Sequence, residues 1–268
     1  MFHGLKKLLR KSAFVRKTYR RYVHPRLPQY ELEVYILRRT QFDRCIDVGA
    51  NEGVYSILLS RHADRVYAFE PVGHLFEDLR GMNIENLSVY NLALGNETKE
   101  MEISFPAING EACYALSTLR PVVVGENEKI ERQRVRVAKF DDFAGEIDFE
   151  RIDFVKIDVE GFELEVLHGM KDLVESKGPA LMIEIEQRHN PRYLEVFDYL
   201  HALHYQPYVT EDGISIRALE MQELPNIQAS FELNSTRKFS RGEQRNYINN
   251  FFFLRSNHKS LFPVKQEE

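Results

Sequence analysis

From Arg44 onward, short apolar runs alternate with stretches of helical periodicity, and this alternation most restricts how the chain can fold. Short apolar runs predict strands, and longer stretches with apolar residues three or four positions apart predict helices. The expected strands are residues 45–48, 65–70, 87–92, 154–158, 180–185, 206–210 and 250–254, and the expected helices are residues 53–61, 74–82, 163–173 and 193–203. Such an order forms βαβ units, so the sequence predicts an α/β fold with a doubly wound, mostly parallel sheet.

Residues 99–137 interrupt this alternation. Two segments, residues 101–105 and 134–137, have the composition of strands, and an irregular stretch containing Asn109-Gly110 lies between them. We interpret the region as inserted short strands with a loop beside the main sheet. A long ordered loop in a compact domain is often functional, so we expect this region to contribute to a binding site.

The charges are distributed unevenly along the chain. Nine lysine and arginine residues and no acidic residue precede Glu31, which leaves 27 of the 36 basic side chains against all 41 acidic ones. We therefore expect a basic segment, residues 1–28, followed by one domain, residues 29–268. Apolar residues at helical spacing predict that residues 1–26 contact an anionic membrane surface or pack as a helix on the domain. The N-terminus lacks the apolar stretch of a secretory signal, so we expect a protein in the cytoplasm or peripherally at the inner membrane surface.

Residues 47–53, Asp-Val-Gly-Ala-Asn-Glu-Gly, have the composition of a ligand-binding turn between a strand and a helix. Gly49 permits a tight turn, and Gly53 allows the backbone to approach a ligand closely. The unpaired N–H groups at the start of the following helix suit an anion such as a carboxylate. Glu70 ends the second expected strand, where an acid can accept hydrogen bonds from both hydroxyls of a ribose.

The glycine spacing distinguishes between two cofactors with such sites. Nicotinamide sites carry G-x-G-x-x-G, whereas here Gly49 and Gly53 are separated by three residues with Asn51 between them. Asp47 precedes the first glycine, where a carboxylate suits the ammonium group of an amino-acid ligand. The sequence therefore favours S-adenosylmethionine over a nicotinamide dinucleotide.

Several longer stretches resemble the FkbM-type methyltransferase family. They are residues 46–56, Phe69-Glu70-Pro71, residues 91–95, residues 155–163 (Val-Lys-Ile-Asp-Val-Glu-Gly-Phe-Glu), residues 166–169 and Ile183-Glu184. The resemblance implies a Rossmann-like class I methyltransferase fold, S-adenosylmethionine as cofactor, and O-methyl transfer, often to sugars of glycolipids, polysaccharides or secondary metabolites. The cofactor residues that it implies are Asp47, Gly49, Asn51 and Gly53 for the methionine part, Glu70 for the ribose, and Asn91 and Ala93 for the adenine.

Methyl transfer to a hydroxyl needs an aligned acceptor and removal of a proton. Asp158 and Glu160 follow the fourth expected strand and Glu184 and Glu186 the fifth, and alternation along a strand would put each pair on one face. If the strands are neighbours, up to four carboxylates meet near the reacting methyl group. This cluster is compatible with a general base, with a divalent cation such as Mg²⁺ or Ca²⁺, or with a structural ion pair to a residue such as Lys156.

A small-molecule or glycan acceptor is expected, with residues 106–123 lining its pocket. His189, just past the fifth expected strand, is a further candidate catalytic residue. A nucleic-acid methyltransferase is one alternative because the basic segment could follow phosphates, but residues 158–161 lack the stacking aromatic of base-methylating enzymes and the domain is acidic. A cofactor-binding protein without catalysis is another, although such a protein would be expected to lose residues such as Gly49 and Glu70.

Overall fold

The computed structural model describes residues 32–108, 111–112, 114, 117–120, 129–143, 145–187, 190–229, 248–258 and 260–265. Within these residues the main element is an eight-stranded sheet with the order β11-β10-β12-β9-β8-β1-β2-β3. Its strands are β1 (Phe42–Val48), β2 (Ala63–Phe69), β3 (Leu87–Tyr90), β8 (Ile152–Ile157), β9 (Ala180–Glu184), β10 (Gln206–Val209), β11 (Arg217–Ala218) and β12 (Asn250–Leu254). The five neighbouring strands β9, β8, β1, β2 and β3 pair in parallel. Beyond β9, the strands β12, β10 and β11 pair antiparallel. The α/β fold with a mostly parallel sheet is thus confirmed.

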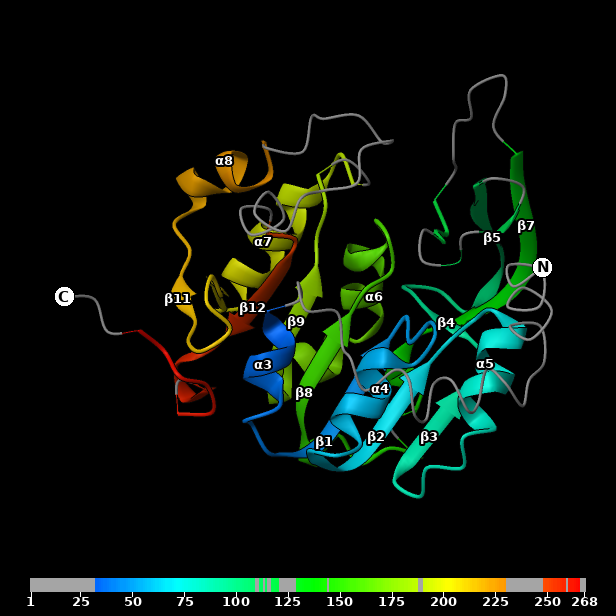
Figure 1. The fold of residues 1–268 in the computed structure, drawn as a ribbon, viewed down its shortest axis with the longest axis horizontal. Coiled ribbons are helices and arrows are strands. Elements are labelled where there is room, and N and C mark those ends of the chain that lie inside the picture. Colours follow the sequence, from blue (N-terminus) through cyan, green and yellow to red (C-terminus); the bar gives the residue numbers. More distant parts are fainter. Residues whose placement is uncertain are drawn as a thin grey trace, which may run out of the picture.

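Helices cover both faces of the main sheet (Figure 1). They are α3 (Glu33–Leu37), α4 (Val54–Leu59), α5 (Gly73–Arg80), α6 (Glu163–Gly169), α7 (Tyr193–Ala202) and α8 (Leu224–Ala229). Alternate residues of β1 enter different cores, because Ile46 and Val48 pack with α6 and α7 whereas Cys45 packs with α3 and α4. Strand β1 lies between β2 and β8, which is where the strand order reverses. In a doubly wound sheet, ligands bind at this position, outside the carboxyl ends of the strands.

The inserted region forms a second, four-stranded sheet in the order β4-β7-β5-β6 (Figure 1). Its strands are β4 (Ala93–Leu94), β5 (Lys99–Ile108), β6 (Glu111–Ala112) and β7 (Lys129–Ala138). We expected short strands, but β5 and β7 each have ten residues and pair antiparallel over most of their length. The side chains of Ile103, Phe105, Val135 and Val137 are buried in the same core as α6 and α7. The insertion is therefore a packed layer of the folded domain.

The helix expected at residues 163–173 and the strand expected at residues 154–158 end at other residues than predicted. The helical path that begins with α6 continues through a π-helical turn, Leu173–Lys177, and ends at Gly178, which has a left-handed φ of 59°. Strand β8 ends at Ile157, and Glu160 and Gly161 follow with φ values of 50° and 96°. The expectation that strand alternation places Asp158 and Glu160 on one face is therefore wrong, because left-handed backbone ends the pleat.

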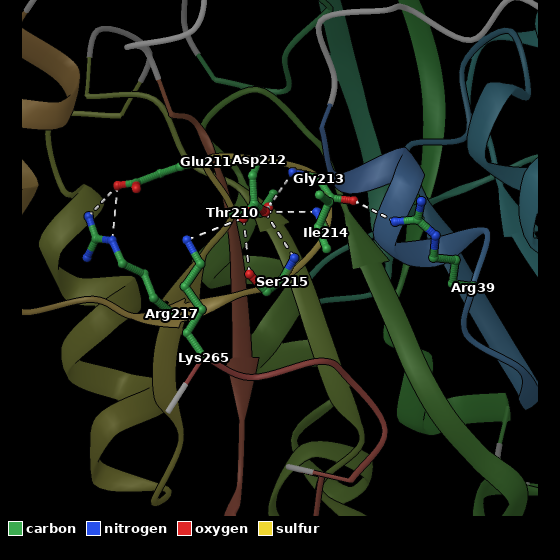
Figure 2. A network of polar contacts seen from close by, with 9 residues as sticks. All are labelled: Arg39, Thr210, Glu211, Asp212, Gly213, Ile214, Ser215, Arg217 and Lys265. Atoms are coloured by element: carbon green, nitrogen blue, oxygen red, sulfur yellow. Dashed lines mark hydrogen bonds and ion pairs between the residues drawn. The ribbon is translucent and has the colours of Figure 1, made fainter. Parts of the chain in front are cut away.

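A polar network lies at the β11 edge of the main sheet, beside β10 and far from the other edge strand, β3 (Figure 2). The Asp212 carboxylate accepts hydrogen bonds from the backbone N–H groups of Ile214 (2.8 Å) and Ser215 (3.0 Å) and lies 3.3 Å from Lys265 Nζ. Burial raises the pKa of Asp212, but the hydrogen bonds from Ser215, Ile214 and Lys265 together lower it well below its usual range. Arg39 donates to the carbonyl of Gly213 (3.1 Å), so the network ties the segment after α3 and the C-terminal segment to this edge.

The basic segment, residues 1–28, lies outside the described residues, and the expected membrane contact of residues 1–26 stays a prediction. In the described part of the chain, no helix has both the length and the apolar character that crossing a bilayer requires. Cys45 is buried and free, as its place in an apolar run indicates.

Candidate active site

A cavity lies at the carboxyl ends of β1, β2 and β8, with the inserted sheet along one side. Its empty space, counted together with the open solvent at its mouth, is about 530 Å³. Its lining residues are Val48, Gly49, Asn51, Phe69, Glu70, Pro71, Ala93, Leu94, Ile103, Ser117, Leu119, Asp158, Val159 and Glu160. The cavity therefore occupies the position where a doubly wound sheet binds its ligand, and it includes several of the residues that the sequence singles out.

Packing within the protein explains both glycines of the turn after β1. Gly49 has a φ of 78°, and a Cβ atom there would lie 1.9 Å from the carbonyl oxygen of Asp158. Gly53 caps α4 with a φ of 82°, and a Cβ atom there would lie 2.4 Å from Leu79 Cδ1. The close approach at these positions is to the protein's own backbone and core, and Gly49 alone of the two also lines the cavity.

Glu70 is a buried carboxylate at the cavity wall. Only 3% of its surface is exposed, and its two oxygens accept hydrogen bonds from the backbone N–H groups of Asn51 (2.6 Å) and Val72 (2.7 Å). Burial raises the pKa of Glu70 to about 7, although the two hydrogen bonds favour the ionised form. Because each carboxylate oxygen has two acceptor sites, the group can still accept hydrogen bonds from a ligand diol.

The raised pKa of Glu70 makes stability depend on pH. Folding raises this pKa from 4.5 to about 7, so the folded state binds more protons in that range. The contribution of Glu70 to stability is therefore complete below pH 4.5 and is lost as the pH rises to about 7. The Glu70→Gln variant cannot titrate here, and we expect its unfolding free energy relative to wild type to increase by on the order of 3 kcal/mol between about pH 4.5 and pH 8. Urea denaturation across this range measures the difference, and a difference independent of pH would contradict the assignment.

Three of the residues that the resemblance implies for the cofactor, Asp47, Gly53 and Asn91, are not among the described residues that line the cavity. Asp47 is completely buried, accepts a hydrogen bond from Ser56 Oγ (2.6 Å), and has its second oxygen 3.9 Å from Lys156 Nζ. Asn91 donates to the carbonyl oxygens of Glu70 and Pro71, both at 3.0 Å, and so stabilises the turn after β2.

Asp158 lines the cavity and is paired with a buried lysine. Lys156 Nζ donates to Asp158 Oδ2 (3.1 Å), and the ammonium also lies 4.5 Å from the centre of the Tyr55 ring. Burial lowers the pKa of Lys156, but the charges of Asp158, Asp47 and Glu184 and the hydrogen bond to Asp158 together raise it by more, so the side chain stays an ammonium. Lys156 thus holds the Asp158 carboxylate in place and offsets part of the negative charge.

The acids after β8 and β9 lie close enough to interact, as the parallel pairing of these strands predicts. Burial, and next the charges of Asp158 and Glu160, raise the pKa of Glu184 well above its ordinary value. Asn249 Nδ2 donates to Glu184 (2.5 Å) and to Glu186 (3.1 Å). No signal in the sequence points to Asn249, because it reaches the cluster from the residue just before the antiparallel strand β12.

Hydrogen bonds fix the turn at Glu160 and Gly161. The carbonyl of Glu160 accepts a hydrogen bond from Thr118 Oγ1 (2.7 Å), and the N–H of Gly161 donates to Glu163 (2.6 Å). The other oxygen of Glu163 accepts from Asn190 Nδ2 (3.0 Å). This arrangement fixes the Glu160 backbone beside the cavity and ties it to the inserted segment that contains Ser117 and Leu119.

His189 lies outside the described residues, and its expected catalytic role stays a prediction. Among the residues that the structure places, no group of three or more His, Cys, Asp or Glu side chains has an arrangement that could hold a metal ion. The divalent cation considered from the sequence therefore has no support among the described residues and stays a prediction.

Comparison with known proteins identifies the domain. The family model of the methyltransferase FkbM domain matches residues 47–207, more than half of the chain. The chain belongs to the FkbM methyltransferase family. This match confirms the resemblance seen in the sequence. The matched range includes every described residue that lines the cavity.

Individual relatives share the domain at low identity. Methyltransferase 1 of Beauveria bassiana is 29% identical over 175 residues, which are 54% of this chain and 70% of the relative. AMB antimetabolite synthetase AmbE of Pseudomonas aeruginosa is 26% identical over 176 residues, which are 53% of this chain but only 8% of that protein. The crystal structure of methyltransferase FkbM from Methylobacillus flagellatus aligns with a TM-score of 0.46 and 16% identity, covering 80% of this chain and 44% of the other. The protein described here thus covers only a small part of AmbE and less than half of the M. flagellatus chain.

Proposed function

We propose that this FkbM domain is an S-adenosylmethionine-dependent O-methyltransferase that acts on a hydroxyl of an uncharged acceptor, such as a sugar of a glycolipid, polysaccharide or secondary metabolite. Family membership supports methyl transfer with this cofactor. The observation that carries the proposal is the charge of the cavity. Among the residues that the structure describes, its lining includes three carboxylates, Glu70, Asp158 and Glu160, and no lysine, arginine or histidine.

The described residues suit S-adenosylmethionine better than a nicotinamide dinucleotide. Glu70 offers its remaining acceptor sites to a ribose diol, and Phe69, Ala93 and Leu94 provide apolar surface for an adenine ring. The pyrophosphate of a dinucleotide would bring two negative charges among carboxylates with no cation in the lining to offset them.

Asp158 is the residue that we assign to the acceptor proton. When bound, S-adenosylmethionine supplies a methyl group on an electrophilic sulfonium. The Asp158 carboxylate lines the cavity and is oriented by Lys156 at 3.1 Å, so it can accept the proton of an acceptor hydroxyl that lies beside it. Glu184 interacts with the same cluster but is not among the described residues that line the cavity, so it is less well placed to reach an acceptor.

A screen with labelled cofactor tests the acceptor class. We expect the isotopically labelled methyl group of S-adenosylmethionine to be transferred to neutral sugars or their lipid-linked forms and not to RNA or DNA, because the acidic cavity repels a polyanion. Mass spectrometry of the product locates the methyl group on oxygen. Label found only in nucleic acid, or on nitrogen or carbon of any acceptor, would overturn the proposed specificity.

A further inference from the structure

We propose that Asp47 is a positioning residue for methyl transfer: it acts through Lys156 on the base, Asp158, and does not bind the cofactor. This inference rests on the proposed function and extends it to a residue behind the cavity wall. The sequence led us to expect Asp47 beside the methionine part of the cofactor. The two assignments predict different effects of the same substitution.

The pairing of β1 with β8 places Asp47 next to Lys156. The two residues are register partners in these parallel strands, so their side chains leave the same face of the sheet. The Asp47 side chain is completely buried, and Asp47 is not among the described residues that line the cavity. Asp158, two residues beyond Lys156, does line it. Lys156 therefore lies between a buried carboxylate and a carboxylate of the cavity.

Helix α4 fixes the orientation of Asp47. The hydroxyl of Ser56 donates to Asp47 Oδ2 (2.6 Å), and Asp47 Oδ1 has no hydrogen-bond partner among the described residues. That second oxygen lies 3.9 Å from Lys156 Nζ. Burial raises the pKa of Asp47, and the charge of Lys156 is the largest cause that opposes this rise. The two side chains are therefore coupled by charge although they share no hydrogen bond.

Stability alone does not account for a charged pair at this position. Taking two charges out of water costs free energy that their attraction often fails to repay, and apolar residues of similar volume are often as stable. The neighbours on this face of the sheet, Cys45, Phe154 and Met182, are buried in one apolar cluster. An apolar pair would suit this core, so an ion pair that ends at a cavity carboxylate points to chemistry.

The chemical use of Asp47 follows from the sharing of one ammonium. Lys156 Nζ donates to Asp158 Oδ2 at 3.1 Å while Asp47 attracts it from the other side. With a neutral residue at position 47, the attraction of the ammonium would act on Asp158 with less opposition. The Asp158 carboxylate would then be drawn toward the lysine, away from an acceptor hydroxyl, and would take up its proton less readily.

The Asp47→Asn variant tests the inference, because asparagine keeps the size and an oxygen for Ser56 but not the charge. We expect single-turnover methyl transfer at saturating cofactor to be roughly tenfold slower. Calorimetry should show an affinity for S-adenosylmethionine within about twofold of wild type. Adding Asp47→Asn to Asp158→Asn should slow transfer no further, because the effect of Asp47 passes through Asp158.

Asp153→Asn is the matched control. Asp153 also lies on β8, accepts one hydrogen bond, from the N–H of Asp43 (2.9 Å), and has a second oxygen without a hydrogen-bond partner in the described part of the chain. It lies toward the start of the strand, away from the cavity at its carboxyl end. This variant should keep both the wild-type rate and the wild-type cofactor affinity.

A second variant keeps the test decisive if Asp47→Asn does not fold. Asp47→Asn combined with Lys156→Met removes both charges together, so it leaves no uncompensated charge at this pair and should unfold at about the urea concentration of wild type. Methyl transfer by this folded protein should still be at least roughly tenfold slower. A wild-type rate in it would overturn the inference.

The alternative roles of Asp47 give other results. Weaker cofactor binding by Asp47→Asn with an unchanged rate at saturation would make Asp47 a cofactor ligand, and lower stability with an unchanged rate would make it merely structural. A further loss of rate on adding it to Asp158→Asn would show independent action. Each of these results overturns the inference and leaves the proposed function standing. If wild-type protein methylates no hydroxyl acceptor, the proposed function fails and the inference fails with it.

Discussion

Replacing Gly49 by alanine will unfold the domain or lower its unfolding free energy by more than about 3 kcal/mol, because two costs add at this position. The residue has a φ of 78°, which strains any side chain, and a Cβ atom would lie 1.9 Å from the carbonyl oxygen of Asp158. The backbone at Asp158 is fixed in turn, because its N–H donates a hydrogen bond to the carbonyl oxygen of Val48 (3.0 Å). The turn after β1 therefore cannot move away without breaking the pairing of β1 and β8.

Gly145→Ala is the matched control for this change. A Cβ atom there has no neighbour within 4 Å, so the variant should be as stable as wild type or slightly more stable. Chemical denaturation followed by circular dichroism measures both variants. A Gly49→Ala protein that unfolds at the wild-type denaturant concentration would refute the packing argument.

Asp158→Asn is expected to slow the chemical step by about 10²–10⁴-fold at saturating cofactor, the usual effect of losing a general base. Asparagine keeps an oxygen that can accept the hydrogen bond from Lys156 but cannot take up the acceptor proton at neutral pH. Single-turnover methylation of the acceptor found by the screen isolates this step from product release. The loss should therefore appear in the rate and far less in the unfolding free energy.

Asp142→Asn controls for the substitution itself, because Asp142 is exposed and contacts Thr98 outside the cavity. A near wild-type rate for Asp158→Asn would remove Asp158 from the mechanism and direct attention to Glu160, Glu184 or His189. A wild-type rate that disappears with a chelator would instead favour the metal interpretation.

The main sheet could be predicted from the sequence because its signals are local. The inner parallel strands β1, β2, β8 and β9 contain short apolar runs buried on both faces, and the glycines at 49 and 53 mark the turn between the first strand and its helix. Neighbouring positions for β8 and β9 follow from the same βαβ rule. These features depend on a few adjacent residues, so no distant contact was needed to infer them.

The parts that the sequence left open depend on distant contacts. The ten-residue pairing of β5 with β7 joins segments that an irregular stretch separates, and polar residues along β7 hide its strand character. The left-handed backbone at Glu160 depends partly on Thr118, and the contact of Asn249 with Glu184 depends on where β12 joins the sheet. The same limit applies to the glycines, whose close neighbours, Asp158 and Leu79, lie far along the chain.

Titration of the wild-type protein with S-adenosylmethionine and with NAD tests most directly whether the acidic cavity is the cofactor site of a methyltransferase. We predict saturable binding of S-adenosylmethionine and none of NAD. The Glu70→Ala variant should lose one or two hydrogen bonds to the ribose, a cost of about 1–3 kcal/mol that weakens binding by about 5- to 150-fold. Binding of NAD in preference to S-adenosylmethionine, or unchanged affinity for S-adenosylmethionine in a folded Glu70→Ala protein, would contradict the account.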